Sequence, residues 1–387
     1  MRPYVRTRSC AQNIIEIGQQ AIKRKKDMKI VIAPDSFKGT LSAKEVATGI
    51  AERLRLRYGT AELVVLPVSD GGEGLVDCLA SAMPTHKVTC TVTGPLGAPT
   101  RAELLIAGDL AVIEMAQAAG LPMVNPPDVM RTTTYGVGEM IAIAEKEGAK
   151  RILLGLGGSA TNDLGCGMAA ALGARFYDGT DCFVPVGGTL GKVTHIEYGE
   201  PHDVTALCDV KNPLYGPNGA AYVYGRQKGA TDETLPVLDE GLRHVAALLQ
   251  KDGKTDFDQP GAGAAGGLGA GVVAFLGGKL RKGIDAVLDA VHFDEIVKDA
   301  DLVITGEGRL DSQSFEGKVI DGIIKRCKCP VVALCGQAQA GLDYRTWGLD
   351  AVFTSAKHQK TADYKKEARN TLAAAADELA DALTSNA

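Results

Sequence analysis

Five short apolar runs constrain the fold of this chain more than any other feature of its sequence. They lie at residues 30–33, 63–67, 302–305, 331–334 and 351–354. Their length and unbroken apolar character are typical of strands buried on both faces, as in a parallel sheet. Helical patterns separate them, the first opening with a capping box at Ser42 and Glu45 and the last covering roughly 364–384. The sequence therefore predicts an α/β fold, a doubly wound five-stranded parallel sheet in the flavodoxin-like order 2-1-3-4-5.

The middle of the chain has a different pattern. Short runs rich in Val, Leu and Ile at 88–114 suggest antiparallel strands with turns, and further strands are expected at 151–156 and 204–208. Helices are expected near 134–148, 164–173 and 232–250. A length of 387 residues suits two domains. We therefore expect one domain from 28–87 plus 285–387, with a mixed α/β domain, 88–284, inserted in it.

Residues 1–27 differ from the rest, because they are basic while the whole chain has a formal net charge of −5. They also lack the long apolar core of a signal peptide. We interpret them as a disordered or non-native leader that arises from an upstream start. A basic targeting arm is the alternative, and a chain that starts at Met28 should then lose activity.

Overall composition narrows the class of protein. The acidic net charge argues against a nucleic-acid partner, and no apolar run reaches the roughly 20 residues that a membrane span needs. Nine scattered cysteines are typical of reduced thiols, which suggests a cytoplasmic protein. Cys327 and Cys329 form the pattern closest to a metal site, but no histidine lies near them, so zinc is not expected there.

Two polar loops follow the first and third predicted strands. The first carries Asp35, Ser36 and Lys38, and the second carries Glu307 and Arg309, with Asp311 and Lys318 just beyond. In the predicted strand order these loops meet at the switch point of the sheet, where open α/β sheets bind ligands. A helix cap with a solvated lysine, or a structural ion-pair network, would explain the same residues. Their coincidence at the switch point favours an active site.

Three other segments carry polar side chains among glycines. Residues 69–74 read Ser-Asp-Gly-Gly-Glu-Gly, and residues 155–163 form a glycine-rich loop after a strand, which can cradle phosphates with backbone amides. The second loop also fits a dinucleotide fingerprint, although it lies mid-chain. The third segment runs from Asp209 and Asn212 to Lys228. Glycine-rich 261–278 is too apolar for a linker and is expected to be a tightly packed helix entrance.

The chemistry of these loops favours phosphoryl transfer. The loops hold carboxylates, lysine and arginine around glycines and no histidine, so imidazole base catalysis is not expected. Phosphoryl transfer depends mainly on positioning and charge neutralisation, which such groups supply. The sequence contains no P-loop motif.

Seven strings, in order, resemble the type-1 glycerate kinases, the family of bacterial glycerate 2-kinases, from residue 28 to about 380. They are APDSFKG (33–39), PVSDGGEG (67–74), GLGGSATND (155–163), DVKNPL (209–214), QKGA (227–230), GAAGGLGA (263–270) and TGEGRLD (305–311). The resemblance implies ATP-dependent phosphorylation of D-glycerate, with 2-phosphoglycerate the usual bacterial product, and it implies Mg²⁺. Leu164 stands where the resemblance leads us to expect a second glycine.

We assign roles on this basis. Lys38 and Arg309 would neutralise phosphate charge, and Asp209 and Glu307 would hold magnesium. Asp70 is the proposed base, with Asp35 and Asp163 as equal alternatives. Substrate or nucleotide contacts are expected from the remaining polar and glycine positions, namely Asp35, Ser36, Ser69, Gly71, Gly72, Glu73, Gly157, Gly158, Ser159, Thr161, Asn162, Asn212, Lys228, Asp311 and Lys318.

Several questions stay open at this point. We expect the reaction to occur in a cleft between the domains, and a homo-oligomer is possible. Which loop binds ATP and which binds glycerate does not follow from the residues. Two alternatives from other classes are an NAD-linked oxidoreductase that uses the 155–160 loop, and a non-catalytic sensor of a nucleotide or sugar acid.

Overall fold

The computed structural model describes residues 28–72, 74–315, 317–361 and 363–384, so the basic leader at 1–27 and Glu73 lie outside the described residues. The chain forms two compact units. Unit 1 takes its described residues from Met1–Asp70, Asp77–Ala82 and Val287–Ala387, and unit 2 consists of Gly71–Val76 and Met83–Ala286. That each unit is an independently folding domain, with the boundaries expected from the sequence, stays a prediction.

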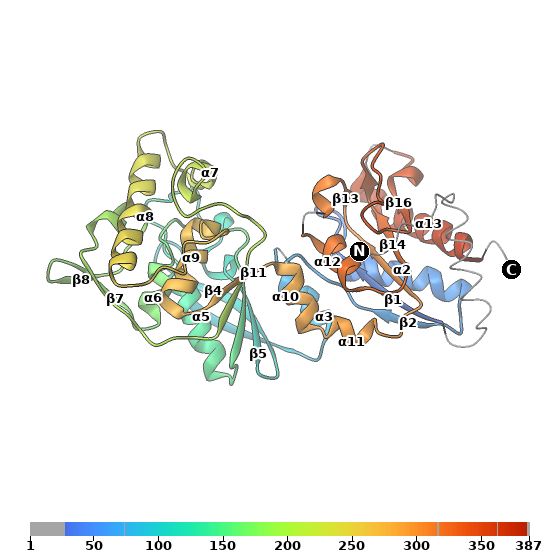
Figure 1. Cartoon of the computed structure of the whole chain (residues 1–387), viewed down its shortest axis with the longest axis horizontal. Coiled ribbons are helices and arrows are strands. Elements are labelled where there is room, and N and C mark those ends of the chain that lie inside the picture. The colour runs from blue at the N-terminus through green and yellow to red at the C-terminus, as the bar shows by residue number, and fades with distance from the viewer. Residues whose placement is uncertain (1–27, 73, 316, 362, 385–387) are drawn as a thin grey trace. The chain divides into compact units, whose positions relative to one another are not determined.

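Unit 1 is built on a five-stranded parallel sheet with the order β2-β1-β12-β14-β16 (Figure 1). Read from β2, this is the flavodoxin-like order 2-1-3-4-5, so the predicted fold class is confirmed. The register pairs Ile30 with Leu302 and Ile30 with Leu63, which places β1 between β12 and the edge strand β2. The strands are β1 (Lys29–Pro34), β2 (Glu62–Val65), β12 (Leu302–Gly306), β14 (Val331–Cys335) and β16 (Ala351–Thr354), and a short parallel pair is made by β13 (Arg309–Leu310) and β15 (Gln337–Ala338).

Two helices cover one face of this sheet. Helix α2 (Ala43–Arg57) starts at the predicted capping box, where Ser42 Oγ accepts from the Glu45 amide at 3.2 Å. Its buried face, which includes Ile50, shares one apolar core with α13 (Tyr364–Thr384) and the sheet. The two helices lie side by side, and Arg53 and Asp377 join them through two hydrogen bonds of 2.8 and 2.6 Å.

The opposite face of the sheet carries the alternate side chains of its strands, because successive strand residues point to opposite sides. Helix α12 (Val319–Arg326) packs against β12, and its first residues are buried. The other short elements of unit 1 are α11 (Phe293–Ile296), η4 (Ser312–Phe315) and η5 (Ala356–His358), and α3 (Leu75–Ala82) and α10 (Gly283–Ala290) each have residues in both units.

Unit 2 is built on a six-stranded mixed sheet with the order β11-β10-β6-β5-β4-β3. Strands β3, β4 and β5 form an antiparallel meander, as the 88–114 pattern predicts, and β5, β6, β10 and β11 are parallel. The strands are β3 (His86–Thr93), β4 (Pro99–Ala107), β5 (Leu110–Glu114), β6 (Arg151–Gly155), β10 (Val204–Leu207) and β11 (Lys279–Arg281), and a separate three-stranded sheet has β7 (Arg175–Asp178), β8 (Asp181–Phe183) and β9 (His195–Glu197).

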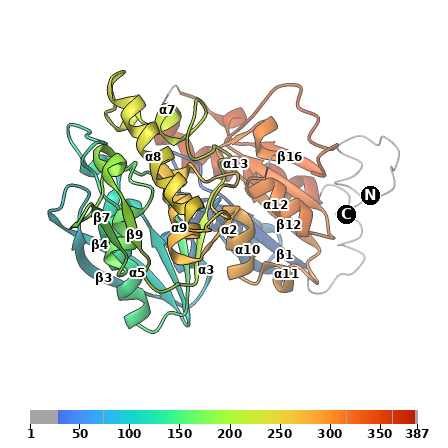
Figure 2. The same cartoon turned by 60° about the vertical axis from the view of Figure 1, so that its left-hand side comes forward.

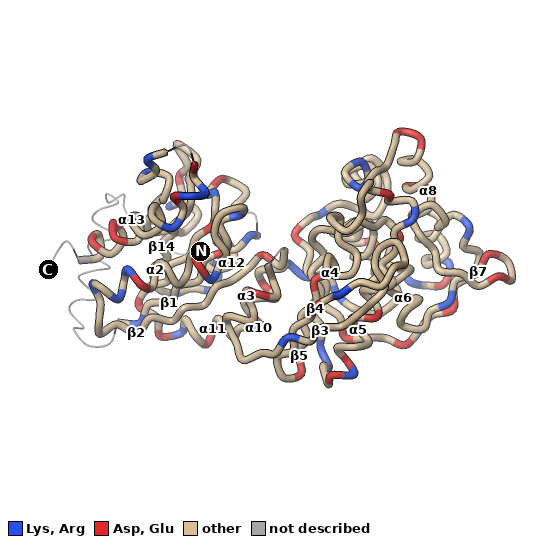
Figure 3. The backbone as a smooth tube through the Cα atoms, turned by 180° about the vertical axis from the view of Figure 1, so that it is seen from behind, with Lys and Arg blue, Asp and Glu red and all other residues tan. Residues whose placement is uncertain are grey.

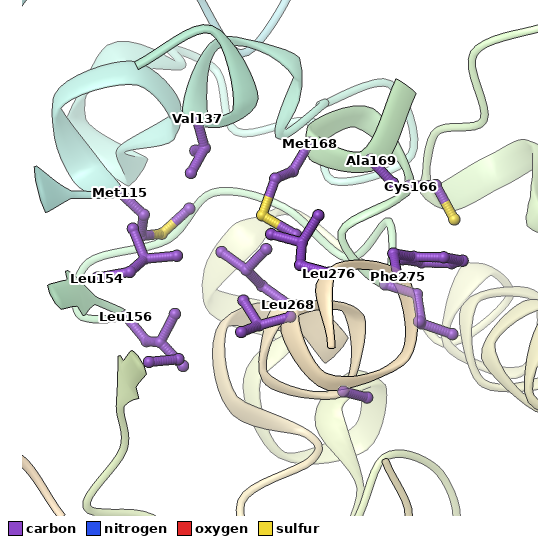
Figure 4. Packing of buried hydrophobic residues seen from close by; sticks show 14 of the residues in the cluster. Met115, Val137, Leu154, Leu156, Cys166, Met168, Ala169, Leu268, Phe275 and Leu276 are labelled. Carbon is purple, nitrogen blue, oxygen red and sulfur yellow. The ribbon is translucent and has the colours of Figure 1, made fainter. Parts of the chain in front are cut away.

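One large core joins the sheet of unit 2 to its helices. Figure 4 shows Met115 and Leu154, at the sheet, turned toward Met168 and Leu268 on two of the helices. Helix α9 packs against β10, β11 and α7, and Figure 2 shows α7, α8 and α9 of this unit in yellow and gold. The helices are α4 (Ala116–Ala119), η1 (Leu121–Met123), α5 (Tyr135–Lys146), α6 (Cys166–Ala171), η2 (Gly187–Lys192), α7 (Ala220–Tyr224), η3 (Arg226–Lys228), α8 (Thr234–Lys251) and α9 (Ala264–Leu276).

The glycine-rich segment forms α9 and the turn that leads into it, which confirms the predicted helix entrance. Residues 265–267 have left-handed backbone conformations, and the regular helix follows them. A Cβ atom on Gly266 would lie 1.9 Å from the Thr161 carbonyl oxygen, and one on Gly271 would lie 2.2 Å from the Leu164 carbonyl oxygen. Glycine at these positions therefore lets α9 pack backbone to backbone against the 155–164 loop.

Charged residues are interspersed along the backbone of both units (Figure 3). None of the helices in the described ranges is long and apolar enough to cross a membrane.

Candidate functional site

A cavity of about 360 Å³ lies in unit 1 at the carboxyl ends of the parallel strands. The loops after β1, β12, β14 and β16 form its walls, and the start of α13 closes one side. This is the switch-point position predicted from the strand order. The lining residues are Asp35, Ser36, Phe37, Lys38, Thr40, Asp70, Glu307, Gly308, Arg309, Asp311, Lys318, Gly336, Gln337, Ser355, Ala356, Gln359, Tyr364, Ala368 and Thr371.

Glycines allow the loops of this cavity to approach one another closely. A Cβ atom on Gly306 would lie 1.9 Å from the Leu334 carbonyl oxygen, and one on Gly336 would lie 2.4 Å from the Gly308 carbonyl oxygen. The Asp35 amide also donates to the Gly306 carbonyl at 2.8 Å. These contacts fix the loops after β1, β12 and β14 against each other, so the polar side chains that they carry are held at one end of the sheet.

Three carboxylates crowd the floor of this cavity. Asp35 is only 7% exposed, and burial, with help from the nearby Asp70 and Glu307 charges, raises its pKa to about 7. Burial also raises the pKa of Glu307, whose Oε1 atom is buried without a hydrogen-bond partner. Carboxylates such as Asp35 and Glu307, whose pKa values are raised by burial and by neighbouring acidic groups, are stabilised when a cation or a proton joins them. The floor of the cavity is therefore suited to a cation.

Cationic side chains line the same cavity. Lys38 Nζ lies 3.5 Å from Asp70 Oδ2, and the Asp70 charge is the main cause that raises the pKa of Lys38. Arg309 Nε lies 3.6 Å from Asp311 Oδ2. Both cations are exposed, Lys38 at 76% and Arg309 at 71%, and such loose exposed pairs contribute little stability. The two side chains can therefore reorient toward an anionic ligand at low energetic cost.

The glycine-rich loop of unit 2 is organised around a buried lysine. Lys228 is 3% exposed, and its ammonium group donates to Ser159 Oγ at 2.7 Å and to the Thr161 carbonyl oxygen at 2.8 Å. Burial lowers the pKa of Lys228 to about 7, while the Asp163 charge acts in the opposite direction. Lys228 thus ties η3 to the loop that follows β6.

Asp163 is a completely enclosed carboxylate in the same loop. Its Oδ2 atom accepts from the amide and hydroxyl of Thr134 at 2.7 and 2.8 Å and from the Gly167 amide at 3.3 Å, and its Oδ1 atom accepts from the Gly165 amide at 3.2 Å. Burial raises its pKa and these hydrogen bonds oppose the rise. The geometry gives Asp163 a positioning role, because its oxygens are occupied by the loop before α5 and the start of α6.

Two neighbours of Asp163 have buried polar atoms without partners. Neither the side-chain oxygen nor the side-chain nitrogen of Asn162 makes a hydrogen bond, and the Thr161 hydroxyl is also unpartnered. Both side chains are almost fully buried. Leaving such groups unpaired costs about 1–3 kcal/mol each. These side chains therefore lower the stability of this loop.

The segment after β10 has mainly local contacts. Asn212 accepts from the Tyr224 hydroxyl at 2.7 Å and donates to the Asn218 carbonyl at 2.9 Å, which explains its place in a turn. Asp209 accepts from the Gly283 amide at 3.0 Å.

The sequence-predicted residues fall into two groups. Eight of them line the cavity of unit 1, whereas Ser69, which is 3% exposed, does not line it. The structure does not describe Glu73. The eight cavity residues are Asp35, Ser36, Lys38, Asp70, Glu307, Arg309, Asp311 and Lys318, and those in unit 2 are Gly71, Gly72, Gly157, Gly158, Ser159, Thr161, Asn162, Asp163, Asp209, Asn212 and Lys228.

Sequence reasoning missed the side of the cavity formed after β14 and β16. Gln337, Ser355 and Tyr364 lie there, with Gln359. A signal was available, because Gln337 and Ser355 follow the fourth and fifth predicted strands as Asp35 and Glu307 follow the first and third. The residues of these later loops that line the cavity are uncharged, and the sequence-based prediction of the site relied on charged side chains.

Comparisons with known proteins agree over nearly the whole chain. The model of the family described as the glycerate kinase family matches residues 30–384. A glycerate kinase of Bacillus subtilis (strain 168) is 45% identical over 84% of this chain and 90% of its own length. The glycerate 2-kinase of Escherichia coli (strain K12) is 43% identical, with the same coverage of each chain.

A solved structure shows the same fold. A crystal structure from Salmonella typhimurium LT2, named as a glycerate kinase 2, superposes with a TM-score of 0.82 at 42% identity. The match covers 93% of this chain and 99% of the other.

Proposed function

This chain belongs to the glycerate kinase family and is a kinase, and on that premise we propose that it transfers the terminal phosphoryl group of ATP to D-glycerate. The name of the Escherichia coli relative, a glycerate 2-kinase, supports 2-phosphoglycerate as the product. Membership of a kinase family sets aside the two alternatives that the sequence left open, an NAD-linked oxidoreductase and a non-catalytic sensor.

The observation that carries this proposal is the cavity of unit 1. It brings the exposed cations Lys38 and Arg309 to the same cavity as four carboxylates, at the carboxyl ends of parallel strands. Phosphoryl transfer needs positive groups that hold and neutralise phosphate oxygens. It also needs a carboxylate that receives or orients the hydroxyl proton of the acceptor.

Magnesium fits the residues of this cavity. The described ranges contain no cluster of three or more His, Cys, Asp or Glu side chains that would form a metal cage. Mg²⁺ is usually bound by one or two carboxylates, with phosphate oxygens and waters as its other ligands. Glu307, with its buried unpartnered oxygen, is the best-placed ligand. When bound, Mg²⁺ would neutralise phosphate charge. A shared magnesium site of Glu307 and Asp209, which lies in unit 2, stays a prediction.

The geometry narrows the choice of base. Asp35 and Asp70 line the cavity, so a substrate hydroxyl can reach them. Asp163 is 0% exposed and already accepts four hydrogen bonds. We therefore propose that Asp35 or Asp70 accepts or orients the hydroxyl proton, and that Asp163 supports the loop of unit 2. The cleft between domains, the cytoplasmic location and a homo-oligomer stay predictions.

A direct assay tests this function. The full chain should release ADP when it is supplied with ATP, Mg²⁺ and D-glycerate, and phosphorus NMR should identify 2-phosphoglycerate. No ADP release with D-glycerate, together with turnover of another sugar acid, would contradict the proposed substrate. A 3-phosphoglycerate product would contradict only the position of transfer.

A further inference from the structure

The cavity of unit 1 has two chemically different halves. The residues after β1, β2 and β12 supply all of its charged side chains, which include Lys38, Asp70 and Arg309. The opposite half is formed by the residues after β14 and β16 and by the first turns of α13. Its lining is uncharged, with Gln337 and Tyr364 as its larger members.

The size and polarity of the cavity point to one elongated ligand. Its volume of about 360 Å³ lies within the range of roughly 300–1,000 Å³ that is typical of small-molecule pockets. A three-carbon acid could use the charged half alone and would leave the uncharged half empty. A nucleoside triphosphate matches both halves, because it has a polyanionic end and an uncharged planar base.

We propose that the nucleoside of the triphosphate occupies the uncharged half, with its base stacked on Tyr364, while the phosphates lie among Lys38, Arg309 and Lys318. This inference rests on the proposed function, because it identifies which substrate of that reaction occupies this cavity.

Tyr364 is the natural stacking surface. It is the first residue of α13 and is 54% exposed although it lines the cavity, so its ring is open to a planar ligand. The aromatic ring offers a π face that any base can stack on. Gln337, which is also exposed, carries an amide that can both donate to and accept from the edge of a base.

Two probes separate the halves of the cavity. ATP engages both halves, whereas inorganic tripolyphosphate has no base and engages only the charged half. Their dissociation constants would be measured by titration calorimetry with Mg²⁺ on the full chain. Tyr364→Ala should weaken ATP binding about tenfold or more, the loss expected for a base–aromatic stack. It should change tripolyphosphate binding less than twofold.

Matched variants make the test specific. Tyr364→Phe keeps the ring and should bind ATP within about twofold of the wild type. Lys318→Ala should weaken both probes. Tyr222→Ala removes a tyrosine that is 40% exposed in unit 2, and it should change neither constant. Tyr364→Leu, which keeps the bulk without an aromatic face, replaces Tyr364→Ala if that variant does not fold.

Several results would overturn the inference. They are an unchanged ATP constant in Tyr364→Ala, an equal loss for ATP and tripolyphosphate in a folded Tyr364 variant, or no binding of tripolyphosphate to the wild type. The proposed function has a separate failure. A chain that binds ATP through Tyr364 but does not phosphorylate glycerate would contradict the proposed substrate and support this inference.

Discussion

The buried ammonium group of Lys228 predicts an unusual dependence of stability on pH. Its pKa is lowered from an ordinary 10.5 to about 7, with burial as the main cause. In the unfolded chain the lysine keeps its proton up to about pH 10.5. Between about pH 7 and 10.5 the unfolded state therefore binds more protons than the folded state, so stability should rise with pH. Below about pH 7 both states are protonated and this contribution is flat.

The size of the effect follows from the same difference. The pKa of Lys228 falls from 10.5 to about 7 on folding, and each pKa unit corresponds to about 1.36 kcal/mol. Burial of the charged ammonium group therefore costs roughly 5 kcal/mol at pH 6 and below. Between pH 6.5 and 9.5 the free energy of unfolding of the wild type should therefore rise by roughly 3 kcal/mol. Lys228→Met has no such charge and should lack that gain, although it loses the hydrogen bonds to Ser159 and Thr161 at every pH.

Urea unfolding at several pH values measures this difference. The free energy of unfolding of the wild type minus that of Lys228→Met should increase with pH over the window from 7 to about 9.5. Lys251→Met, at the exposed end of α8, is the control and should follow the wild-type slope. Parallel curves for the wild type and Lys228→Met would refute the reasoning, because they would mean that Lys228 keeps its proton in the folded state.

Three further predictions follow from the site and its supports. Arg309→Ala should lower kcat/KM by a factor that corresponds to roughly 2–4 kcal/mol of transition-state stabilisation, with little change in Tm. Arg101→Ala, which removes an exposed arginine on β4, should change neither quantity. An unchanged kcat/KM in Arg309→Ala would mean that Arg309 does not bind phosphate. Asp163→Ala should destabilise the fold by about 3 kcal/mol or more, because four hydrogen-bond donors lose their acceptor. Thermal unfolding measures this loss, and a loss below about 1 kcal/mol would contradict the described hydrogen bonds. Gly266→Ala should lower Tm by several degrees, because its Cβ would lie 1.9 Å from a carbonyl oxygen and its φ is +69°. Gly191→Ala is the control and should not lower Tm, because the space around its Cβ is open. Equal Tm values for the two variants would refute the close packing of α9.

Most of unit 1 could be predicted from sequence because its interior strands β1, β12 and β14 are buried on both faces. A strand such as Ile30–Ala33 is apolar throughout, so it stands out without knowledge of its neighbours. Parallel strands also need crossover helices, and the handedness of crossovers limits the possible orders. The order then placed the loops that carry Asp35 and Glu307 next to each other, and the structure confirms that both line one cavity.

The roles of single side chains were harder to predict. Asp163 looked like a catalytic candidate because it is a carboxylate in a glycine-rich loop, but the hydrogen bonds that enclose it come partly from Thr134, 29 positions earlier in the chain. No local pattern encodes that contact. The burial of Lys228 depends in the same way on Ser159, 69 positions away.

Leu164 shows a conformational cost that the sequence only hinted at. It stands at the position where the family resemblance led us to expect glycine, and its φ is +54°, in the left-handed region. This conformation costs roughly 1–2 kcal/mol for a residue with a Cβ. The side chain is completely buried in the core of unit 2, and this burial offsets the cost.

Because β1 pairs with a strand far along the chain, it must wait for that partner during synthesis. Ile30 of β1 pairs with Leu302 of β12, so this interior strand of unit 1 leaves the ribosome 272 residues before one of its two neighbours. At about 5–20 residues per second, that interval is roughly 14–54 s. During this time an apolar strand has one open edge, which is a template for pairing with other chains. The continuous segment Met83–Ala286 emerges whole within the interval, so most of unit 2 can fold before β12 is available to cover this edge of β1.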